Sequence, residues 1–369
     1  MRLCYVLLSP TWGMHQYTAD LANRMAEADH EVHLVTTRLV PRDRYAPEVV
    51  IHTPVDTRDR GFSFHGLRTA PSVIREALIT VRSVRPDIVH ITGAHLSNPF
   101  LLRGLRRCGL PTVHTLHDLH PHVGSAYGRL LYFWNAWVRR EADHLLVHGQ
   151  RYRQELLTKG VAPSRVTCTP LTHLFLSHAR QKEVASSPPS VSYEPFALFL
   201  GRLEAYKGLD VLVEAARIAA RSGVGVIIAG PGSLQPHIRR QVPDNVQLHS
   251  GLVTDEEAVD LFRRCGLVVL PYIEASQSAL AAAAYFFGKP VLVSRVGALP
   301  EYVVDGETGW IVPPGDAQAL AAAMTKALAD PETLRRAGVD GRSWYERERR
   351  AEGTALAAMY AGLAHRGGY

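Results

Sequence analysis

Two cations follow a predicted buried strand in the second half of this 369-residue chain. Arg202 and Lys207 come directly after the apolar run Phe196–Leu200. A planar guanidinium fork beside a compact ammonium charge suits two adjoining phosphates, and each charged hydrogen bond contributes about 1.5–3 kcal/mol. A surface ion pair between Glu204 and Lys207 would explain the same residues without a ligand. Both interpretations stay open at this point.

A carboxylate stands at a similar place further along the chain. Glu274 follows the predicted strand Leu267–Leu270, and a helix is predicted to begin near 276–278 and to stop at Gly288. The end of a strand is a poor place to bury an unpaired carboxylate. Sugar hydroxyls could donate to Glu274 while the free amides of the helix face a phosphate. A solvated loop carboxylate is the alternative.

The first half contains a related loop. A predicted strand at 3–9 leads through Gly13 into a predicted helix at 14–28. A glycine lets a ligand approach the backbone, and a helix N-terminus favours an anion. The spacing of a dinucleotide-binding fingerprint is absent, so a tight structural turn explains Gly13 equally well.

Apolar runs of strand length alternate with helical stretches along the whole chain, which is typical of parallel sheets covered on both faces. The other predicted strands are 31–36, 87–92, 111–116, His144–Val147, 225–229, 246–249, 290–294 and 310–312, and the other predicted helices are 72–84 and Pro331–Ala364. We therefore expect an α/β protein with two Rossmann-like, doubly wound domains, at 1–180 and 196–345, joined by a linker at 181–195. Their ligand sites should face one cleft.

The bulk composition is that of a globular protein, with 46% hydrophobic and 21% charged residues. No apolar run approaches the ~20 residues that span a bilayer, and the run at 3–8 is too short for a signal peptide.

Four cysteines without C-x-x-C spacing predict free, buried thiols in a reducing compartment, the cytoplasm. The net charge of +6 is concentrated in residues 1–175, which suits an acidic acceptor, an anionic membrane surface or a solvated Arg-rich surface. No pattern of a nucleic-acid binder is present.

Together these segments resemble the family 4 retaining glycosyltransferases of the GT-B fold, over nearly the whole chain. The spacing Gly201-Arg202-(four residues)-Lys207-Gly208 is similar to the family's phosphate-binding pair. Glu274 matches the first Glu of the family's E-(seven residues)-E motif, and residues 296–309 match the stretch that follows it.

The first domain and the C-terminus carry further points of resemblance. The segment Thr115-Leu116-His117-Asp118 resembles the one whose His lies beside the donor sugar. Residues 346–369 resemble the helix that crosses back onto the first domain.

The resemblance implies sugar transfer from a nucleotide-diphosphate sugar to an acceptor hydroxyl, with retention at the anomeric carbon and without a metal ion or other cofactor. Arg202 and Lys207 would stabilise the leaving diphosphate, and Glu274 would orient the donor sugar. The residues predicted to act in catalysis are Glu274, Arg202, Lys207 and His117, and those predicted to bind the donor are Gly13, Gly201, Ser276, Gln277, Ser278, Ala279 and Leu280.

Two departures from the family pattern affect substrate choice. The second Glu, which by resemblance holds the ribose hydroxyls, is Ala282 here. A uridine-diphosphate sugar is somewhat favoured, with thymidine and guanosine diphosphate sugars as alternatives. The paired glycine of the first loop is reduced to Gly13 followed by Met14, which narrows the acceptor side. The acceptor stays open among small molecules, glycans and lipid-linked compounds.

Other enzymes and a non-catalytic protein share this architecture. A sugar-nucleotide epimerase or a glycosyl phosphorylase would need no organic acceptor. A degenerate homologue would bind and scaffold only, although the joint presence of Arg202, Lys207 and Glu274 argues against it.

Two clusters in the first half suggest other functions. His114, His117, His120 and His122 lie within nine residues, but a zinc site is disfavoured because no Cys or carboxylate cluster lies nearby in sequence. The aromatic segment 132–137 is predicted to bury one helical face, while Arg129, Arg139 and Arg140 leave peripheral docking at the inner membrane face open.

Overall fold

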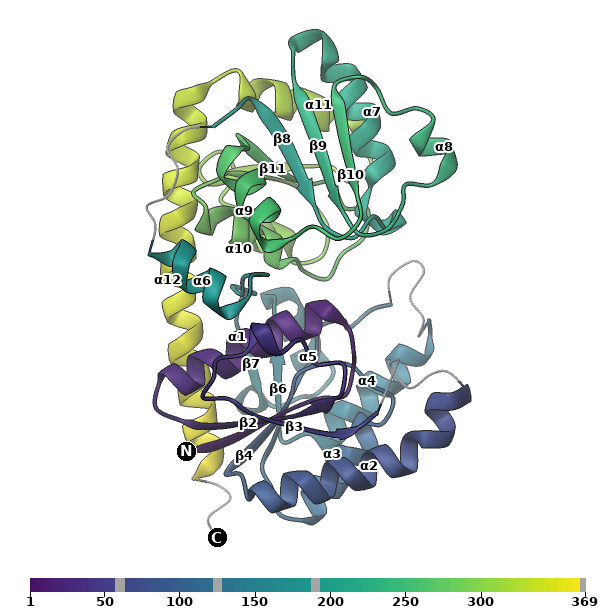
Figure 1. Ribbon diagram of the computed structural model, residues 1–369, viewed down its shortest axis with the longest axis vertical. Coiled ribbons are helices and arrows are strands. Elements are labelled where there is room, and N and C mark those ends of the chain that lie inside the picture. Colours follow the sequence, from purple (N-terminus) through teal and green to yellow (C-terminus); the bar gives the residue numbers. More distant parts are fainter. Residues whose placement is uncertain (57–63, 122–127, 187–192, 366–369) are drawn as a thin grey trace. The chain divides into compact units, whose positions relative to one another are not determined.

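The computed structural model describes residues 1–56, 64–121, 128–186 and 193–365, which form two compact units (Figure 1). Of the described residues, 1–56, 64–121, 128–184 and 351–365 form the first unit, and 185–186 and 193–350 form the second. Each unit contains one sheet with helices around it. The domain limits expected from the sequence stay a prediction.

The first unit contains a seven-stranded sheet in the order β3-β2-β1-β4-β5-β6-β7. Every pairing is parallel. Its strands are β1 (Arg2–Leu7), β2 (Glu31–Thr37), β3 (Val50–Val55), β4 (Ile88–Ile91), β5 (Thr112–Thr115), β6 (His144–Val147) and β7 (Val166–Cys168). Its helices are α1 (Trp12–Glu27), α2 (Phe64–Val84), α3 (Asn98–Arg107), α4 (Leu130–Glu141), α5 (Gln150–Thr158) and α6 (His178–Ala185).

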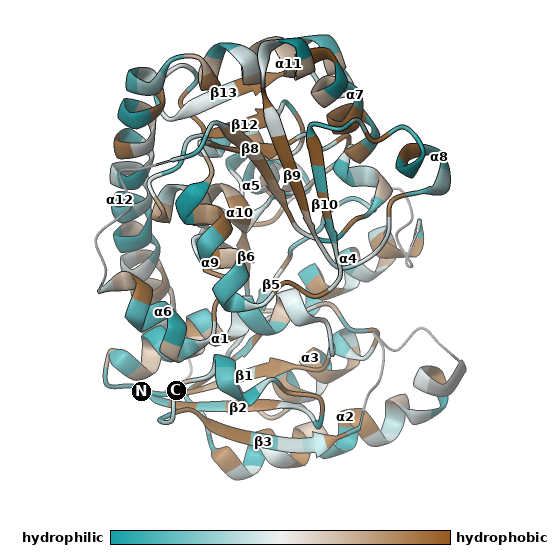
Figure 2. Cartoon of the chain, turned by 45° about the horizontal axis from the view of Figure 1, so that its top comes forward, coloured by the Kyte–Doolittle hydropathy of each residue, from teal (hydrophilic) through white to brown (hydrophobic). Residues whose placement is uncertain are grey.

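The second unit repeats this order with six parallel strands, β10-β9-β8-β11-β12-β13. Its strands are β8 (Phe196–Leu200), β9 (Gly225–Gly230), β10 (Val246–Ser250), β11 (Leu267–Leu270), β12 (Val291–Ser294) and β13 (Gly309–Val312). Its helices are α7 (Leu209–Ala219), α8 (Pro236–Arg239), α9 (Asp255–Arg264), α10 (Ala279–Phe286), α11 (Ala317–Leu328) and α12 (Pro331–Ala364), of which α12 continues into the first unit. Figure 2 shows β8 and β9 almost wholly hydrophobic, as expected for strands covered on both faces.

Both sheets therefore have the doubly wound strand order predicted from the sequence. The order reverses between β1 and β4 in the first sheet and between β8 and β11 in the second. Such a reversal opens a crevice at the carboxyl ends of the two strands, because the following helices leave on opposite faces. The loops after these four strands are consequently the places to look for ligand-binding residues.

The sequence missed the two edge strands of the first sheet. Strand β3 is only partly buried and contains Pro54. Proline has no backbone N–H to donate, and an edge strand tolerates it because one side of that strand has no neighbouring strand to bond. Strand β7 has three residues. Neither segment shows the continuous apolar run that identified the interior strands.

Two predicted helix limits were wrong. Gly13 is the second residue of α1 rather than part of a turn before it. Helix α2 begins at Phe64, so Ser72 is internal and its Oγ bonds the carbonyl of Thr69 instead of capping the helix. Part of the expected linker is helical, because α6 extends to Ala185.

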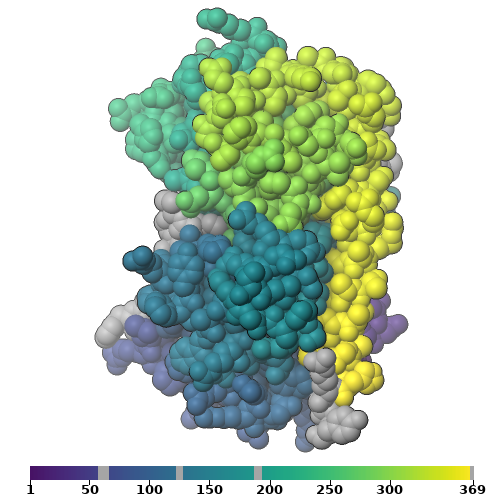
Figure 3. All heavy atoms as spheres, turned by 180° about the vertical axis from the view of Figure 1, so that it is seen from behind, coloured from purple at the N-terminus to yellow at the C-terminus, as the bar shows by residue number. Residues whose placement is uncertain are grey.

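Several helix limits were predicted correctly from their capping residues. Ser278 accepts a hydrogen bond from the amide of Leu280 at the start of α10, and Gly288 follows its end with a φ of +67°. Helix α12 has the predicted limits, and Figure 3 shows one of its sides, in yellow, at the surface. None of the helices in the described residues is long and apolar enough to cross a bilayer.

The C-terminal part of α12 is bonded into the first unit by buried polar groups. Glu352 is buried and accepts a hydrogen bond from Arg24 at 2.8 Å. The Tyr360 hydroxyl bonds His90 Nδ1 at 2.7 Å and the Tyr5 hydroxyl at 3.1 Å. Buried polar groups require such partners, so these bonds specify how residues 351–364 pack on this unit.

Candidate functional site

Three of the predicted catalytic residues flank the crevice of the second sheet. Arg202 and Lys207 follow β8, and Glu274 follows β11, the two strands at which the order reverses. The topology thus brings together residues that are about seventy positions apart in the sequence.

Lys207 is the most constrained of the three residues. Its Nζ donates a hydrogen bond to the Tyr272 hydroxyl at 2.7 Å and lies 4.1 Å from the centroid of the same ring. No carboxylate of the described residues lies within 4 Å of it, so the predicted alternative, an ion pair with Glu204, is not formed. Burial lowers the pKa of Lys207, because desolvation disfavours the ammonium. An anionic ligand would compensate this charge.

Arg202, unlike Lys207, forms an ion pair with a carboxylate. Its Nη1 lies 2.7 Å from Glu204 Oε1, and both side chains are exposed by more than a third. Exposed pairs of this kind contribute little to stability. The guanidinium can therefore exchange Glu204 for a phosphate oxygen at low cost.

Two glycines let the backbone approach closely around these cations. Gly208 has a φ of +67°, and a Cβ there would lie 2.0 Å from the carbonyl oxygen of Pro271. Gly201 has a φ of +146°, and a Cβ there would lie 4.0 Å from Lys207 Nζ. A side chain at either position would strain the backbone, and at Gly201 it would also occupy space beside the ammonium.

The loop that carries Glu274 is fixed from two sides. The amides of Ile273 and Glu274 both donate to the carbonyl of Tyr206, at 2.9 and 3.4 Å. On the other side the amide of Ala298 donates to the carbonyl of Ser276 at 2.8 Å. Glu274 itself is half-buried. Its carboxylate is thus carried by a rigid backbone at the carboxyl end of β11.

Tyr272 connects Lys207 to the start of α10. Its hydroxyl lies 3.3 Å from Ser278 Oγ, which also caps the helix. Nearby, Gln277 Oε1 is buried and has no hydrogen-bond partner among the described residues. An unsatisfied buried acceptor is costly, and a ligand N–H or O–H would satisfy it. The remaining predicted donor-binding residues, Ala279 and Leu280, are half-buried in the first turn of α10.

Ala282 is fully buried within α10. The residues on either side of it, from Ala281 to Tyr285, are equally buried. A carboxylate at this position would have to be accommodated inside the helix packing, so the methyl group is the better fit to its surroundings.

The corresponding loop of the first sheet contains no charged pair. Gly13 lies in the first turn of α1, and a Cβ there would meet no atom within 4 Å. The position is therefore open, although no positive φ requires a glycine. The neighbouring Trp12 is exposed and is covered on one face by the guanidinium of Arg44 at 4.7 Å.

His117 lies among other rings at the carboxyl ends of the first sheet. Its Nε2 bonds the carbonyl of Thr92 at 2.9 Å, and Tyr17 contacts its ring edge-on at 4.8 Å. His148 and His173 also contact Tyr17, at 5.2 and 5.6 Å. These two histidines were missed. His148 directly follows a predicted strand and could have been found, whereas His173 follows the unpredicted β7.

The other histidines of the sequence cluster do not join His117. His114 is fully buried and bonded to Asn98, and burial lowers its pKa to about 3. His120 is exposed and pairs with Glu155 at 2.8 Å. His122 lies outside the described residues. The residues that the structure describes contain no group of three potential metal ligands.

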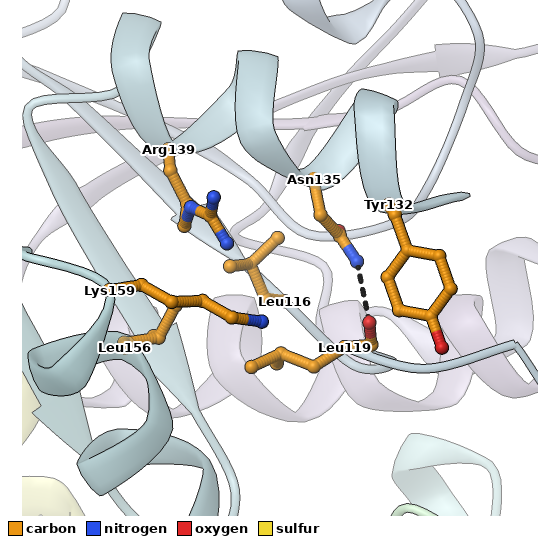
Figure 4. A pocket seen from close by; sticks show the side chains of 7 residues that line it. All are labelled: Leu116, Leu119, Tyr132, Asn135, Arg139, Leu156 and Lys159. Carbon is orange, nitrogen blue, oxygen red and sulfur yellow. Dashed lines mark hydrogen bonds between the residues drawn. The ribbon is translucent and has the colours of Figure 1, made fainter. Parts of the chain in front are cut away.

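The aromatic segment of the first unit is only partly buried. Trp134 is buried, but Phe133 is 75% exposed, because it lies on the outer face of α4. Beneath the helix is a pocket of about 230 Å³, lined by Leu116, Leu119, Tyr132, Asn135, Arg139, Leu156 and Lys159. Figure 4 shows the ends of Arg139 and Lys159 directed toward this space. Contact with a membrane stays a prediction.

Two family models match the chain. The model of the glycosyl transferase 4-like domain matches residues 13–172, and that of the glycosyl transferases group 1 matches residues 194–330. Between them they cover every strand of both sheets except β1. The chain belongs to the group 1, or family 4, glycosyltransferases, and its fold is the GT-B architecture.

Similar proteins support this assignment. A glycogen synthase from Mycobacterium tuberculosis is 30% identical over 270 residues, which is 70% of this chain and 64% of the synthase. The alignment thus spans less than two thirds of that relative. A sucrose-phosphate synthase from Thermosynechococcus elongatus superimposes with a TM-score of 0.77 at 21% identity, covering 98% of this chain and 99% of that one. Anabaena HepE, in complex with UDP and glucose, gives 0.71 at 15%, covering 98% and 100%.

Proposed function

We propose that this protein transfers a sugar from a nucleotide-diphosphate sugar to an acceptor hydroxyl, with retention at the anomeric carbon. Family membership supports the reaction class. The observation that carries the proposal is the desolvated ammonium of Lys207, which has no carboxylate within 4 Å among the described residues and lies beside Arg202 and Gly201 at a sheet crevice. A diphosphate supplies the negative charge that this arrangement lacks.

Arg202 and Lys207 act on the leaving group in this proposal. Charge grows on the diphosphate as its bond to the anomeric carbon breaks, and the two cations stabilise that charge. Lys207 is held in place by Tyr272, so little reorganisation accompanies the reaction. Glu274 accepts hydrogen bonds from sugar hydroxyls, and the amides at the start of α10 face the phosphates. The resemblance predicts that His117 also contacts the donor sugar.

The diphosphate charge is balanced by side chains, so no divalent metal ion is needed. We expect turnover to be unchanged by EDTA and by added Mg²⁺ or Mn²⁺. Loss of turnover in EDTA that a divalent ion restores would contradict this part of the proposal.

We infer that the nucleotide is uridine diphosphate. HepE, which shares the fold, was crystallised with UDP and glucose. The buried acceptor Gln277 Oε1 is also suited to a nucleotide N–H or hydroxyl donor.

The free cysteines among the described residues favour a reducing compartment, the cytoplasm. Of these cysteines, Cys108 is exposed and Cys168 is partly exposed, whereas the sequence predicted buried thiols.

The deciding experiment is a binding screen followed by an activity assay. UDP, GDP and dTDP are titrated by calorimetry. The shift in melting temperature serves as a second measure of binding, because a ligand of the native state raises it. Sugars on the preferred nucleotide are then tested for nucleotide release with and without an acceptor panel. Acceptor-dependent release with retained configuration supports the proposal. Isomerisation of the sugar nucleotide alone, or dependence on inorganic phosphate instead of an organic acceptor, overturns it.

A further inference from the structure

The second unit contains a cavity of about 250 Å³ at the amino ends of its strands, on the side of the sheet opposite to the carboxyl ends that carry the proposed nucleotide site. Gly266 and Pro290 line this cavity and directly precede β11 and β12. Arg202 and Glu274 instead follow the carboxyl ends of β8 and β11. The cavity is therefore separate from the nucleotide site proposed above, and its occupant does not depend on that proposal.

The wall of the cavity is formed where α12 lies directly against a turn. A Cβ on Gly338 of α12 would lie 2.0 Å from the carbonyl oxygen of Gly288. Only a glycine permits this approach, and it brings the helix face with Leu334 and Arg342 over the turn that carries Lys289. The lining is thus built on fixed backbone.

Lys289 is the unusual residue of this cavity. It is only 3% exposed, yet no carboxylate of the described residues lies within 4 Å of its ammonium. Its ammonium lies 5.9 Å from the centroid of the Tyr193 ring. Burial lowers the pKa of Lys289 because desolvation disfavours its charged form. A buried lysine without a partner calls for an anion.

The other cations of the lining are already paired. Arg335 lies 2.6 Å from Glu332, and Arg342 lies 2.8 Å from Glu346. Lys289 is thus the cation of the lining that has no carboxylate within 4 Å among the described residues.

A neutral donor stands beside the lysine. The Tyr193 hydroxyl is buried and has no hydrogen-bond partner in the described part of the chain. Burial and the charges of Asp330 and Glu332 raise its pKa, so it stays protonated. The hydroxyl of Tyr193, without a partner, and the ammonium of Lys289, without a carboxylate within 4 Å, thus line one partly open cavity, and both can donate to the same acceptor.

We propose that this cavity is a binding site for a small phosphate oxyanion, held by Lys289 and Tyr193. Phosphate oxygens accept from both groups, and the negative charge of the ligand compensates the positive charge of Lys289. The bound anion would connect the turn at Lys289 to the first turns of α12.

The test measures phosphate binding by calorimetry and by the shift in melting temperature, with chloride at the same ionic strength as the reference. We expect inorganic phosphate to stabilise the parent protein. Lys289→Met should lose roughly tenfold to hundredfold in phosphate affinity. Tyr193→Phe keeps the ring, removes the donor and should also weaken binding. Glycerol 3-phosphate, tested in parallel, distinguishes a phosphate ester from free phosphate as the preferred ligand.

Two lysine variants serve as controls. Lys326→Met changes an exposed lysine of the same unit and should leave phosphate binding unchanged. Lys207→Met should do the same while weakening nucleotide binding, and Lys289→Met should bind UDP like the parent. The inference is overturned if phosphate acts no more than chloride, if Lys289→Met still binds it, or if Lys207→Met abolishes the effect.

Discussion

The carboxyl ends of the two sheets share one topology but carry opposite kinds of residue. In the first sheet Tyr17 is surrounded by His117, His148 and His173, and burial lowers the pKa of His148 so that it stays neutral. In the second sheet the segment after β8 carries Arg202 and Lys207 beside glycines with positive φ. The first of these regions is crowded with imidazole and phenol rings, and the second presents two cations next to glycines that carry no side chain.

This difference shows how a repeated fold acquires two roles. The strand order fixes where side chains converge, but the residues after the strands decide what can bind there. Glycines and two neighbouring cations suit a diphosphate, whereas imidazoles and hydroxyls suit the hydroxyls of a sugar or an acceptor. The predictions below test each side of this comparison.

The largest expected effect is the loss of a cation from the second sheet. Lys207→Ala or Arg202→Ala should weaken UDP binding by roughly tenfold to hundredfold, because one charged hydrogen bond of about 1.5–3 kcal/mol is removed. Calorimetric titration with UDP measures this, with Lys326→Ala as the control for loss of one positive charge. Parent-like UDP affinity in both variants would remove the phosphate assignment.

Acid should destabilise the first unit more than the second. Burial lowers the pKa of His90, His114 and His148, so the unfolded chain takes up protons near pH 6.5 that the folded chain excludes until lower pH. The free energy of unfolding must fall as the pH drops below about 6.5. Each fully buried histidine contributes on the order of 2 kcal/mol of this loss by pH 5.

Melting temperatures between pH 7 and pH 5 measure this acid effect. His114→Gln should reduce the pH dependence, whereas His249→Gln, at an exposed position of the second unit, should leave it unchanged. An identical pH dependence in the parent and in His114→Gln would mean that His114 does not stay neutral in the folded protein.

Glu274→Gln should distinguish contacts to the transferred sugar from contacts to the phosphates. We expect turnover to fall about tenfold, because hydrogen bonds from sugar hydroxyls to a carboxylate become bonds to a neutral amide. UDP has no transferred sugar, so its affinity should stay within about twofold. Turnover and UDP titration are measured on the same preparation. Equal losses of affinity for UDP and for the sugar nucleotide would move Glu274 out of the sugar site.

The sequence predicted the parts of this protein that depend on continuous burial and on capping. Interior strands such as β8 and β11 are uninterrupted apolar runs, and Ser278 and Gly288 identified the limits of α10. The edge strands β3 and β7 lack that signal, and His173 was missed with β7. The pairing of Lys207 with Tyr272 rather than with Glu204 was not predictable, because it depends on the distance between two loops.

The smallest expected effect concerns the ribose. Ala282 stands where the family places a carboxylate that accepts from both ribose hydroxyls, so the parent should bind UDP and 2′-deoxy-UDP within a few-fold of each other. One missing hydrogen bond is worth about 1 kcal/mol, or roughly fivefold. Ala282→Glu should raise the preference for UDP, and its melting temperature should fall because the position is fully buried. The ratio of the two Kd values is therefore the measure, since it is independent of the fraction folded. A strong preference for the ribonucleotide in the parent would mean that another group, such as Gln277, already holds the ribose.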